Sequence, residues 1–325
     1  MCTSIAMTTK DFYFGRNLDL EYEFGERVIV TPRNYPFSFR KAGELPKHYA
    51  LIGIGTVLEG YPLYAEAANE KGLCMAGLNF PGNAYYPPEE ATDKANVSPF
   101  ELIPWLLGSC STVAEARERL ERVNLIGIPF SEQTPLSPLH WHIADRERSI
   151  VLESTKAGIT IYENPVGVMT NNPTFDFHLL NLSQYMNLTT TDPEEQFKEK
   201  TGMKPFGWGF GGIGLPGDTS TASRFVRTSF LKLNSVCEDD EASSVSQFFH
   251  LLDAASMVRG SVTASAGRYE ITSYSCCINA AKGIFYYKTY GNNQLTAVDM
   301  HRENLKAREL KEYPLQKKQQ ILWMN

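Results

Sequence analysis

Hydrophobic and polar residues alternate along the start of the chain, with one interruption. The alternation covers residues 2–7 and resumes over residues 12–18, and residues 8–11 between them have the composition of a turn. Alternation with a period of two is typical of strands, because successive side chains of a strand point to opposite faces. Two such segments around a short turn predict a β-hairpin.

The register of this hairpin decides which side chains lie next to Cys2. If Met7 pairs with Phe12, Cys2 lies opposite Asn17. A slip of one residue would move Arg16 onto the same face as Cys2. The pattern therefore predicts that Arg16 and Cys2 are close together, but it leaves open whether they face each other.

Later segments have the composition of strands and occur in groups separated by helical patterns. Ser98, Pro99 and Glu101 form an N-terminal capping sequence for a helix through residue 107, and Thr112 with Glu115 caps one through residue 123. This order predicts antiparallel sheets covered by helices. Two further helices are predicted at 224–233 and 244–257, and strands at 28–31, 49–57, 61–67, 73–80, 139–144, 149–154, 159–163, 166–170, 269–279 and 284–290.

Composition assigns this pattern to one globular domain. The chain has 325 residues, of which 42% are hydrophobic and 21% charged, and no serine-, glutamine- or charge-rich linker divides it. A formal net charge of -6 without a basic stripe argues against nucleic-acid binding. We expect a cytoplasmic protein that does not bind a membrane, because neither an export signal nor a membrane-spanning stretch is visible.

Cysteine usage directs attention to the N-terminus. The chain contains six cysteines without a CxxC pair or accompanying histidine spacing, so no metal site is expected. Cys2 directly follows the initiator Met1. If Met1 is removed, Cys2 carries a free α-amine beside its thiol, and one residue then supplies a nucleophile and a proton acceptor. Activation of a nucleophile by an N-terminal amine is an established route to acyl transfer. Taken alone, a cysteine after the start codon is equally compatible with chance.

Four further segments carry polar residues that packing alone would not require. They read FGRNLD at 14–19, GLNFPG at 77–82, TNNPTFDF at 170–177, and GLPGD at 214–218 with SRF at 223–225. Together with the MCT start, they resemble the choloylglycine hydrolase family, N-terminal nucleophile hydrolases that include bile salt hydrolases and penicillin V acylases. The resemblance covers essentially the whole chain. It implies an α+β protein with a four-layer αββα fold, in which two antiparallel sheets lie between helical layers.

The resemblance implies that Cys2 is the nucleophile and that five residues complete the catalytic site: Arg16, Asp19, Asn79, Asn171 and Arg224. Arg16 would keep a positive charge near the sulfur and favour the thiolate. Asp19 would accept a hydrogen bond from the α-amine. In isolation, Arg16 on a strand is more often solvated, and Asp19 is equally suited to capping a turn.

The other three positions also have implied roles. Asn79, with a backbone N–H, would bind the oxyanion of a tetrahedral intermediate. Asn171 would position the α-amine or the substrate amide, although the neighbouring Asn172 and Pro173 also suit a turn. Arg224 would add a second positive charge, unless it lies on the solvent-exposed face of a helix. Which arginine mainly serves the thiol stays open.

The implied substrate is a bile acid conjugated to glycine or taurine. Asn79 favours it, because the resemblance associates asparagine there with bile salt hydrolases and tyrosine with many penicillin V acylases. Cys2 would form a thioester with the bile acyl group and release the amino acid, without a metal or organic cofactor. Another amine could intercept the thioester. The implied acyl pocket consists of Leu18, Tyr22, Leu58, Ala65, Phe130 and Thr134. Each of these residues is equally compatible with a place in the hydrophobic core.

Two alternatives and one assembly prediction remain. Penicillin V acylase is the alternative with the same chemistry, and a non-catalytic bile-acid binding protein is the alternative from another class. The resemblance also implies a homo-oligomer, a tetramer, with residues 185–218 as an extended assembly loop. The GxGxxG sequence at 209–214 lies in that loop. We interpret it as part of the loop, because a dinucleotide site needs a helix where Pro216 and Gly217 follow.

Overall fold

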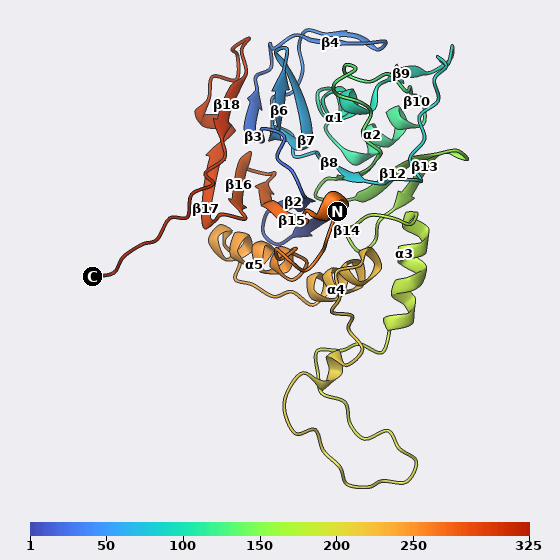
Figure 1. Ribbon diagram of the computed structural model, residues 1–325, viewed down its shortest axis with the longest axis vertical. Helices are drawn as coiled ribbons and strands as arrows, with labels where there is room; N and C mark the ends of the chain where they lie inside the picture. Colours follow the sequence, from blue (N-terminus) through green and yellow to red (C-terminus); the bar gives the residue numbers. More distant parts are fainter.

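Two antiparallel β-sheets packed face to face form the centre of the molecule (Figure 1). The computed structural model describes residues 1–325, apart from the side chain of Ala266. The first sheet has the strand order β14-β1-β2-β15-β16-β17, and the second has the order β13-β12-β11-β8-β7-β6-β3-β18. One hydrophobic cluster with side chains from both sheets fills the space between them.

The strands of the first sheet are β1 (Cys2–Thr8), β2 (Phe12–Leu20), β14 (Val168–Met169), β15 (Ile271–Asn279), β16 (Ile284–Thr289) and β17 (Asn292–Asp299). Those of the second are β3 (Arg27–Thr31), β6 (Leu51–Leu58), β7 (Tyr61–Asn69), β8 (Cys74–Asn79), β11 (Leu139–Ala144), β12 (Ser149–Thr155), β13 (Gly158–Glu163) and β18 (Lys311–Pro314). Two small pairs, β4 (Phe37–Phe39) with β5 (Gly43–Leu45) and β9 (Ala95–Val97) with β10 (Val123–Leu125), lie outside them.

Helices cover the outer face of each sheet, which confirms the predicted αββα layering (Figure 1). The helix α1 (Leu102–Leu107) packs on the second sheet with α2 (Val113–Leu120), and α4 (Thr221–Leu233) and α5 (Glu241–Asp253) pack on the first. The helix α3 (Phe175–Leu182) packs on α4. Short 3-10 turns are η1 (Pro99–Glu101), η2 (Ser183–Tyr185), η3 (Phe210–Gly212), η4 (Ser265–Gly267) and η5 (Met300–Arg302).

The predicted hairpin is present, but the pairing of Cys2 with Asn17 is wrong by one residue. Thr8 belongs to β1 and pairs with Phe12, so the connecting loop has three residues, and Cys2 pairs with Leu18. Arg16 pairs with Ser4. In this register, Cys2 and Arg16 lie on the same face of the sheet, the face toward the second sheet.

Helix boundaries follow the capping residues. The Thr112 side chain accepts a hydrogen bond from the Glu115 N–H, as predicted, but the helix ends at Leu120 because Val123 pairs with Ala95 in the small β9–β10 sheet. At the other predicted cap, the Glu101 carboxylate accepts from the Ser98 N–H at 3.1 Å. The Glu101 N–H in turn donates to the backbone oxygen of Ser98 at 2.9 Å.

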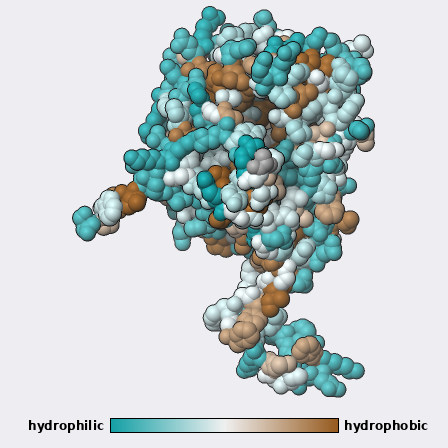
Figure 2. Space-filling model, in the orientation of Figure 1, coloured by the Kyte–Doolittle hydropathy of each residue, from teal (hydrophilic) through white to brown (hydrophobic). Residues whose placement is uncertain are grey.

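The segment between η2 and η3 projects away from the body of the molecule and carries exposed apolar side chains (Figures 1 and 2). Phe206 and Trp208 are 97% and 96% exposed. The glycine-rich sequence at 209–214 contains only the short turn η3, so it lacks the strand and helix of a dinucleotide site. Of the helices that the structure describes, none has both the length and the apolar character needed to cross a membrane.

Candidate active site

Cys2 lies at the beginning of β1, on the face between the two sheets, and is 2% exposed. Met1 precedes it in the chain. The Met1 amine donates a hydrogen bond to the backbone oxygen of Asp19 at 2.7 Å and forms an ion pair with Glu270. In this form of the chain, the nitrogen of Cys2 is therefore an amide and not a free amine.

The Arg16 guanidinium contacts the Cys2 sulfur directly. Its Nη2 donates to Sγ at 2.5 Å, and its Nη1 donates to the backbone oxygen of Gly77 on β8 at 2.5 Å. Arg16 is fully buried, although an arginine on a strand is more often solvated. The hairpin register is the reason, because it turns this side chain into the space between the sheets.

Arg224 approaches the same residue from the other side of the sheet. It lies in the first turn of α4, whose Ser220 cap accepts from the Ser223 N–H. Its Nη1 donates to the backbone oxygen of Cys2 at 2.5 Å and to Thr3 Oγ1 at 2.7 Å. Arg224 therefore binds the backbone of Cys2, whereas Arg16 binds its sulfur. The structure thus distinguishes the positions of the two arginines, which the sequence left open.

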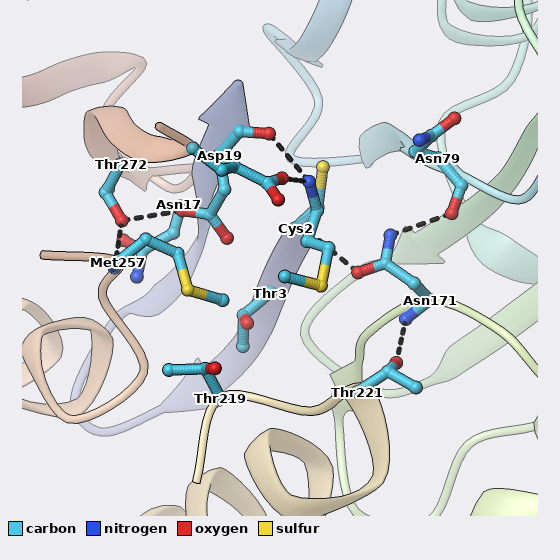
Figure 3. A network of polar contacts seen from close by, with 12 residues as sticks. Cys2, Thr3, Asn17, Asp19, Asn79, Asn171, Thr219, Thr221, Met257 and Thr272 are labelled. Carbon is cyan, nitrogen blue, oxygen red and sulfur yellow. Dashed lines mark hydrogen bonds and ion pairs between the residues drawn. The ribbon is translucent and has the colours of Figure 1, made fainter. Parts of the chain in front are cut away.

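Asn171 connects the site residues (Figure 3). Its Oδ1 accepts from the Cys2 N–H and from Arg224 Nη2, each at 2.8 Å, and its Nδ2 donates to the backbone oxygen of Asn79 at 2.7 Å. Its own N–H donates to Thr221 Oγ1 at 2.9 Å. Both polar atoms of this side chain are thus occupied, and the oxygen points at the nitrogen that would become the α-amine.

Asn79 ends β8 and is partly exposed beside this network (Figure 3). Its backbone oxygen is bonded to Asn171, but its side-chain amide makes no hydrogen bond to any described residue. A side-chain amide N–H without a partner is available to a developing oxyanion.

The Asp19 carboxylate lies on the opposite face of β2 from Arg16. Its Oδ1 accepts from Thr272 Oγ1 at 2.6 Å, whereas its Oδ2 is buried without a hydrogen-bond partner among the described residues. Burial raises the pKa of Asp19, and the positive charge of Arg224 opposes this shift. An unsatisfied carboxylate oxygen next to the N-terminus is a ready acceptor for an ammonium group.

Two residues of the implied acyl pocket, Tyr22 and Phe130, line different cavities. Tyr22 is 52% exposed and lines a cavity of about 460 Å³, while Phe130 lines a separate one of about 400 Å³. Leu18 lies in the core beside Cys2, and Leu58, Ala65 and Thr134 are partly exposed. Above the central N-terminus, Figure 2 shows hydrophobic side chains around a hollow.

Sequence reasoning missed two residues that contact the site. Thr272 bonds the Asp19 carboxylate, and Glu270 binds the Met1 amine. Thr272 lies in β15 and Glu270 just before it, 253 and 269 positions from their partners, and nothing in the local pattern distinguishes them from ordinary strand residues. Among the described side chains, no group of three or more histidine, cysteine, aspartate or glutamate residues is arranged to hold a metal ion.

Comparison with known proteins identifies the family. A family model described as linear amide C–N hydrolases, choloylglycine hydrolase family, matches residues 2–313. The chain belongs to the choloylglycine hydrolase family. The resemblance stated from the motifs is thereby confirmed, and with it the assignment to enzymes that hydrolyse linear amides.

Several members of the choloylglycine hydrolase family are similar over the whole chain. The bile salt hydrolase/transferase of Lactiplantibacillus plantarum is 50% identical over 325 residues, which cover 100% of both chains. A crystal structure of a variant of the conjugated bile acid hydrolase from Clostridium perfringens has a TM-score of 0.92 and 40% identity, covering 100% of both chains. Penicillin V acylase from Agrobacterium tumefaciens shares the fold, with a TM-score of 0.77 and 19% identity over 97% of this chain and 92% of its own.

Proposed function

We propose that this protein hydrolyses the amide bond of bile acids conjugated to glycine or taurine, through a thioester on Cys2. The observation that carries the proposal is the contact between the Arg16 guanidinium and the Cys2 sulfur at 2.5 Å inside a buried network. A permanent positive charge at this position favours the thiolate, which is the nucleophilic form of cysteine. The names of the similar proteins support the choice of substrate.

The reaction begins after Met1 has been removed. The α-amine of Cys2 accepts the thiol proton, and Sγ attacks the amide carbonyl carbon. The resulting oxyanion accepts a hydrogen bond from the free side-chain amide of Asn79. When the intermediate collapses, the C–N bond breaks and the α-ammonium gives its proton to the leaving amine. Asn171 Oδ1, which accepts from the Cys2 nitrogen, orients the amine for both transfers.

Water then cleaves the thioester. The α-amine, again neutral, takes a proton from the water, the hydroxide adds to the carbonyl carbon, and the thiol is regenerated with release of the free bile acid. An amine that reaches the thioester before water would form a new amide. Transfer to amino acids is therefore a proposed side reaction of the same intermediate.

The direct test is release of taurine and glycine from taurocholate and glycocholate by protein that lacks Met1. We expect release from at least one conjugate, and loss of this activity in Cys2→Ser with an unchanged far-UV spectrum, because a hydroxyl is far less acidic than a thiol. Phenoxymethyl penicillin serves as the competing substrate. No release from either conjugate, or a higher kcat/KM on the penicillin, would overturn the proposal, and tight bile-acid binding without turnover would indicate a binding protein.

The acyl group requires an apolar surface near Cys2. We propose that Leu18, Tyr22, Leu58, Ala65, Phe130 and Thr134 form it when the steroid binds. The hydrophobic hollow of Figure 2 and the position of Leu18 next to Cys2 support this arrangement. Burial of apolar surface at about 25 cal/mol per Å² would supply the binding energy.

We further propose that the protein is a cytoplasmic homo-oligomer, assembled through residues 185–218. The apolar side chains of this projecting loop support an interface, because exposed aromatic residues are characteristic of protein contacts. Its exposed apolar residues are Met186, Phe197, Met203, Phe206, Trp208 and Ile213. Light scattering should give the mass of a tetramer for the wild type and a lower mass for the double variant Phe206→Ser/Trp208→Ser; a monomeric wild type would contradict the interface.

A further inference from the structure

Four buried polar side chains form a cluster between the sheets, beside the Cys2 sulfur. They are Arg16 from β2, Glu66 from β7, and Tyr274 and Cys276 from β15, and none is more than 1% exposed. The reaction described above uses only Arg16. Burial of a carboxylate is costly unless it is paired and hydrogen-bonded, so the presence of Glu66 needs a reason.

The Glu66 carboxylate lies between Arg16 and the hydroxyl of Tyr274. The Tyr274 hydroxyl donates to Oε2 at 2.9 Å and lies 3.0 Å from Oε1, and Cys276 Sγ lies 3.6 Å from Oε1. Arg16 Nη1 is 3.6 Å from Oε2. One side of the guanidinium thus faces the Cys2 sulfur, and another faces a carboxylate that is itself held by a hydroxyl.

A β-bulge turns Glu66 into this position. In the pairing of β6 with β7, Ile54 lies opposite Glu66 but Gly55 lies opposite Tyr64, so Ala65 is an extra residue. Tyr64 belongs to the hydrophobic cluster between the second sheet and the helices that cover it. In a regular strand Tyr64 and Glu66 would share a face, because side chains alternate; the bulge places them on opposite faces.

A second bulge lies opposite, on β15. Thr272 pairs with Asp19 and Tyr274 pairs with Leu18, so Ser273 is the extra residue. This bulge points Tyr274 toward Glu66 and leaves Thr272 on the other face, where it bonds the Asp19 carboxylate. Two irregularities in two sheets thus bring the carboxylate and its donor together behind the nucleophile.

The charge of this cluster depends on pH near neutrality. Burial raises the pKa of Glu66 to about 7, against the stabilising effects of Arg16, Tyr274 and Cys276. The titratable or charged groups near this carboxylate are Arg16, Tyr274 and Cys276. Cys2 joins them because Arg16 bonds its sulfur. An ionised Glu66 offsets part of the guanidinium charge that the sulfur experiences, and a protonated Glu66 does not.

We propose that Glu66, held by Tyr274, is a positioning residue that anchors the Arg16 guanidinium against the Cys2 sulfur and offsets part of its charge. The inference rests on the proposed function in one respect, that Cys2 is the nucleophile. Glu66 itself touches no substrate and acts only through Arg16.

The test measures the rate of Cys2 alkylation by iodoacetamide as a function of pH, on protein without Met1, by mass spectrometry of the N-terminal peptide. Glu66→Gln keeps the shape and an acceptor for Tyr274 but removes the negative charge. We expect the alkylation midpoint to move to lower pH by roughly 1 unit, with alkylation up to about tenfold faster at pH values above about 7, where the wild-type Glu66 is ionised. We also expect kcat/KM on glycocholate to fall about tenfold, because Arg16 loses its anchor.

Two further variants separate this role from a contribution to stability alone. Tyr274→Phe removes the donor that stabilises the Glu66 carboxylate, so the midpoint should move in the same direction by a smaller amount. Glu101→Gln, at a carboxylate that is also buried but lies at the end of η1 and the N-cap of α1, should leave the midpoint where it is. Midpoints equal to wild type in both Glu66→Gln and Tyr274→Phe would overturn the inference. Alkylation needs no substrate, so its outcome is independent of whether bile salts are hydrolysed.

Discussion

At the residue scale, the two asparagines of the site have different tasks. Asn171 is bonded through both side-chain atoms, to Cys2, Arg224 and Asn79, so it holds the site together. Asn79 is held only through its backbone, and its side-chain amide has no partner among the described residues. The free amide is therefore the better candidate for contact with the substrate.

This difference leads to a prediction for Asn79→Ala. Removal of one oxyanion donor costs about 3–4 kcal/mol in the transition state, so kcat on glycocholate should fall by about 10²–10³-fold. KM should change little, because the oxyanion exists only after attack. Steady-state kinetics measure both quantities. Asn293→Ala, at an exposed position of the edge strand β17, is the matched control and should behave as wild type; a kcat unchanged in Asn79→Ala would exclude the oxyanion role.

The motifs predicted which residues form the site, but not how each is used. Arg16 and Arg224 carry the same charge and lie in similarly specific motifs. Only the register of the hairpin shows that Arg16 faces the sulfur, and only the position of α4 shows that Arg224 binds the backbone. Contacts such as Thr272 to Asp19 depend on pairing across the whole chain and leave no local signal.

At the element scale, one buried carboxyl joins the start of α3 to the second sheet. Glu153 on β12 accepts from the Phe175 N–H at 3.0 Å and lies 3.1 Å from His140 Nδ1. His140 stacks on Phe80 with 4.1 Å between ring centres. The two motif segments that contain Asn79 and Asn171 are therefore tied together behind the site.

The protonation of Glu153 predicts how stability changes with pH. Burial raises the pKa of Glu153 from 4.5 to about 8 and lowers that of His140 to about 3. Between pH 4.5 and about 8, the unfolded Glu153 carboxyl ionises while the folded one keeps its proton, so the contribution of Glu153 to the free energy of unfolding should fall as pH rises. The contribution of His140, which is neutral when folded, rises with pH up to its unfolded pKa value of 6.5. Glu153→Gln keeps an acceptor and cannot ionise, so its stability should fall less steeply.

Urea unfolding at several pH values across this range measures the slope. Glu163→Gln is the control, because Glu163 lies on the adjacent strand β13 and is 61% exposed at its side chain. The control should keep the wild-type slope. Equal slopes in wild type and Glu153→Gln would mean that the folded carboxyl is ionised.

Elements with clear periodicity and caps could be predicted, and those without them could not. Both central hairpin strands, β8, β11 and β12 follow alternating or continuous apolar patterns. The strands β17 and β18 lie at sheet edges, expose polar side chains and show no such pattern. The helix α3 was not predicted, because its first residues belong to the TNNPTFDF motif, whose composition is also typical of a turn.

At the scale of the whole molecule, the layers assemble the site from distant parts of the chain. β15, near the C-terminal end, lies between β2 and β16, and α4 covers the sheet that begins at Cys2. Local patterns predicted antiparallel sheets with helices on them, but not this strand order. The αββα fold came from the family resemblance, because only the combination of motifs along the chain specifies which strands become neighbours.

The central claim is that loss of Met1 converts the amide nitrogen of Cys2 into a free amine, which makes Cys2 a nucleophile with its own base. The most direct measurement is an intact mass spectrum and a taurocholate assay on the same preparation, beside a chain with glutamate inserted between Met1 and Cys2. The account predicts that the active protein begins at Cys2 and that the extended chain, folded but blocked, releases no taurine. Full turnover by protein that still carries Met1 would contradict it.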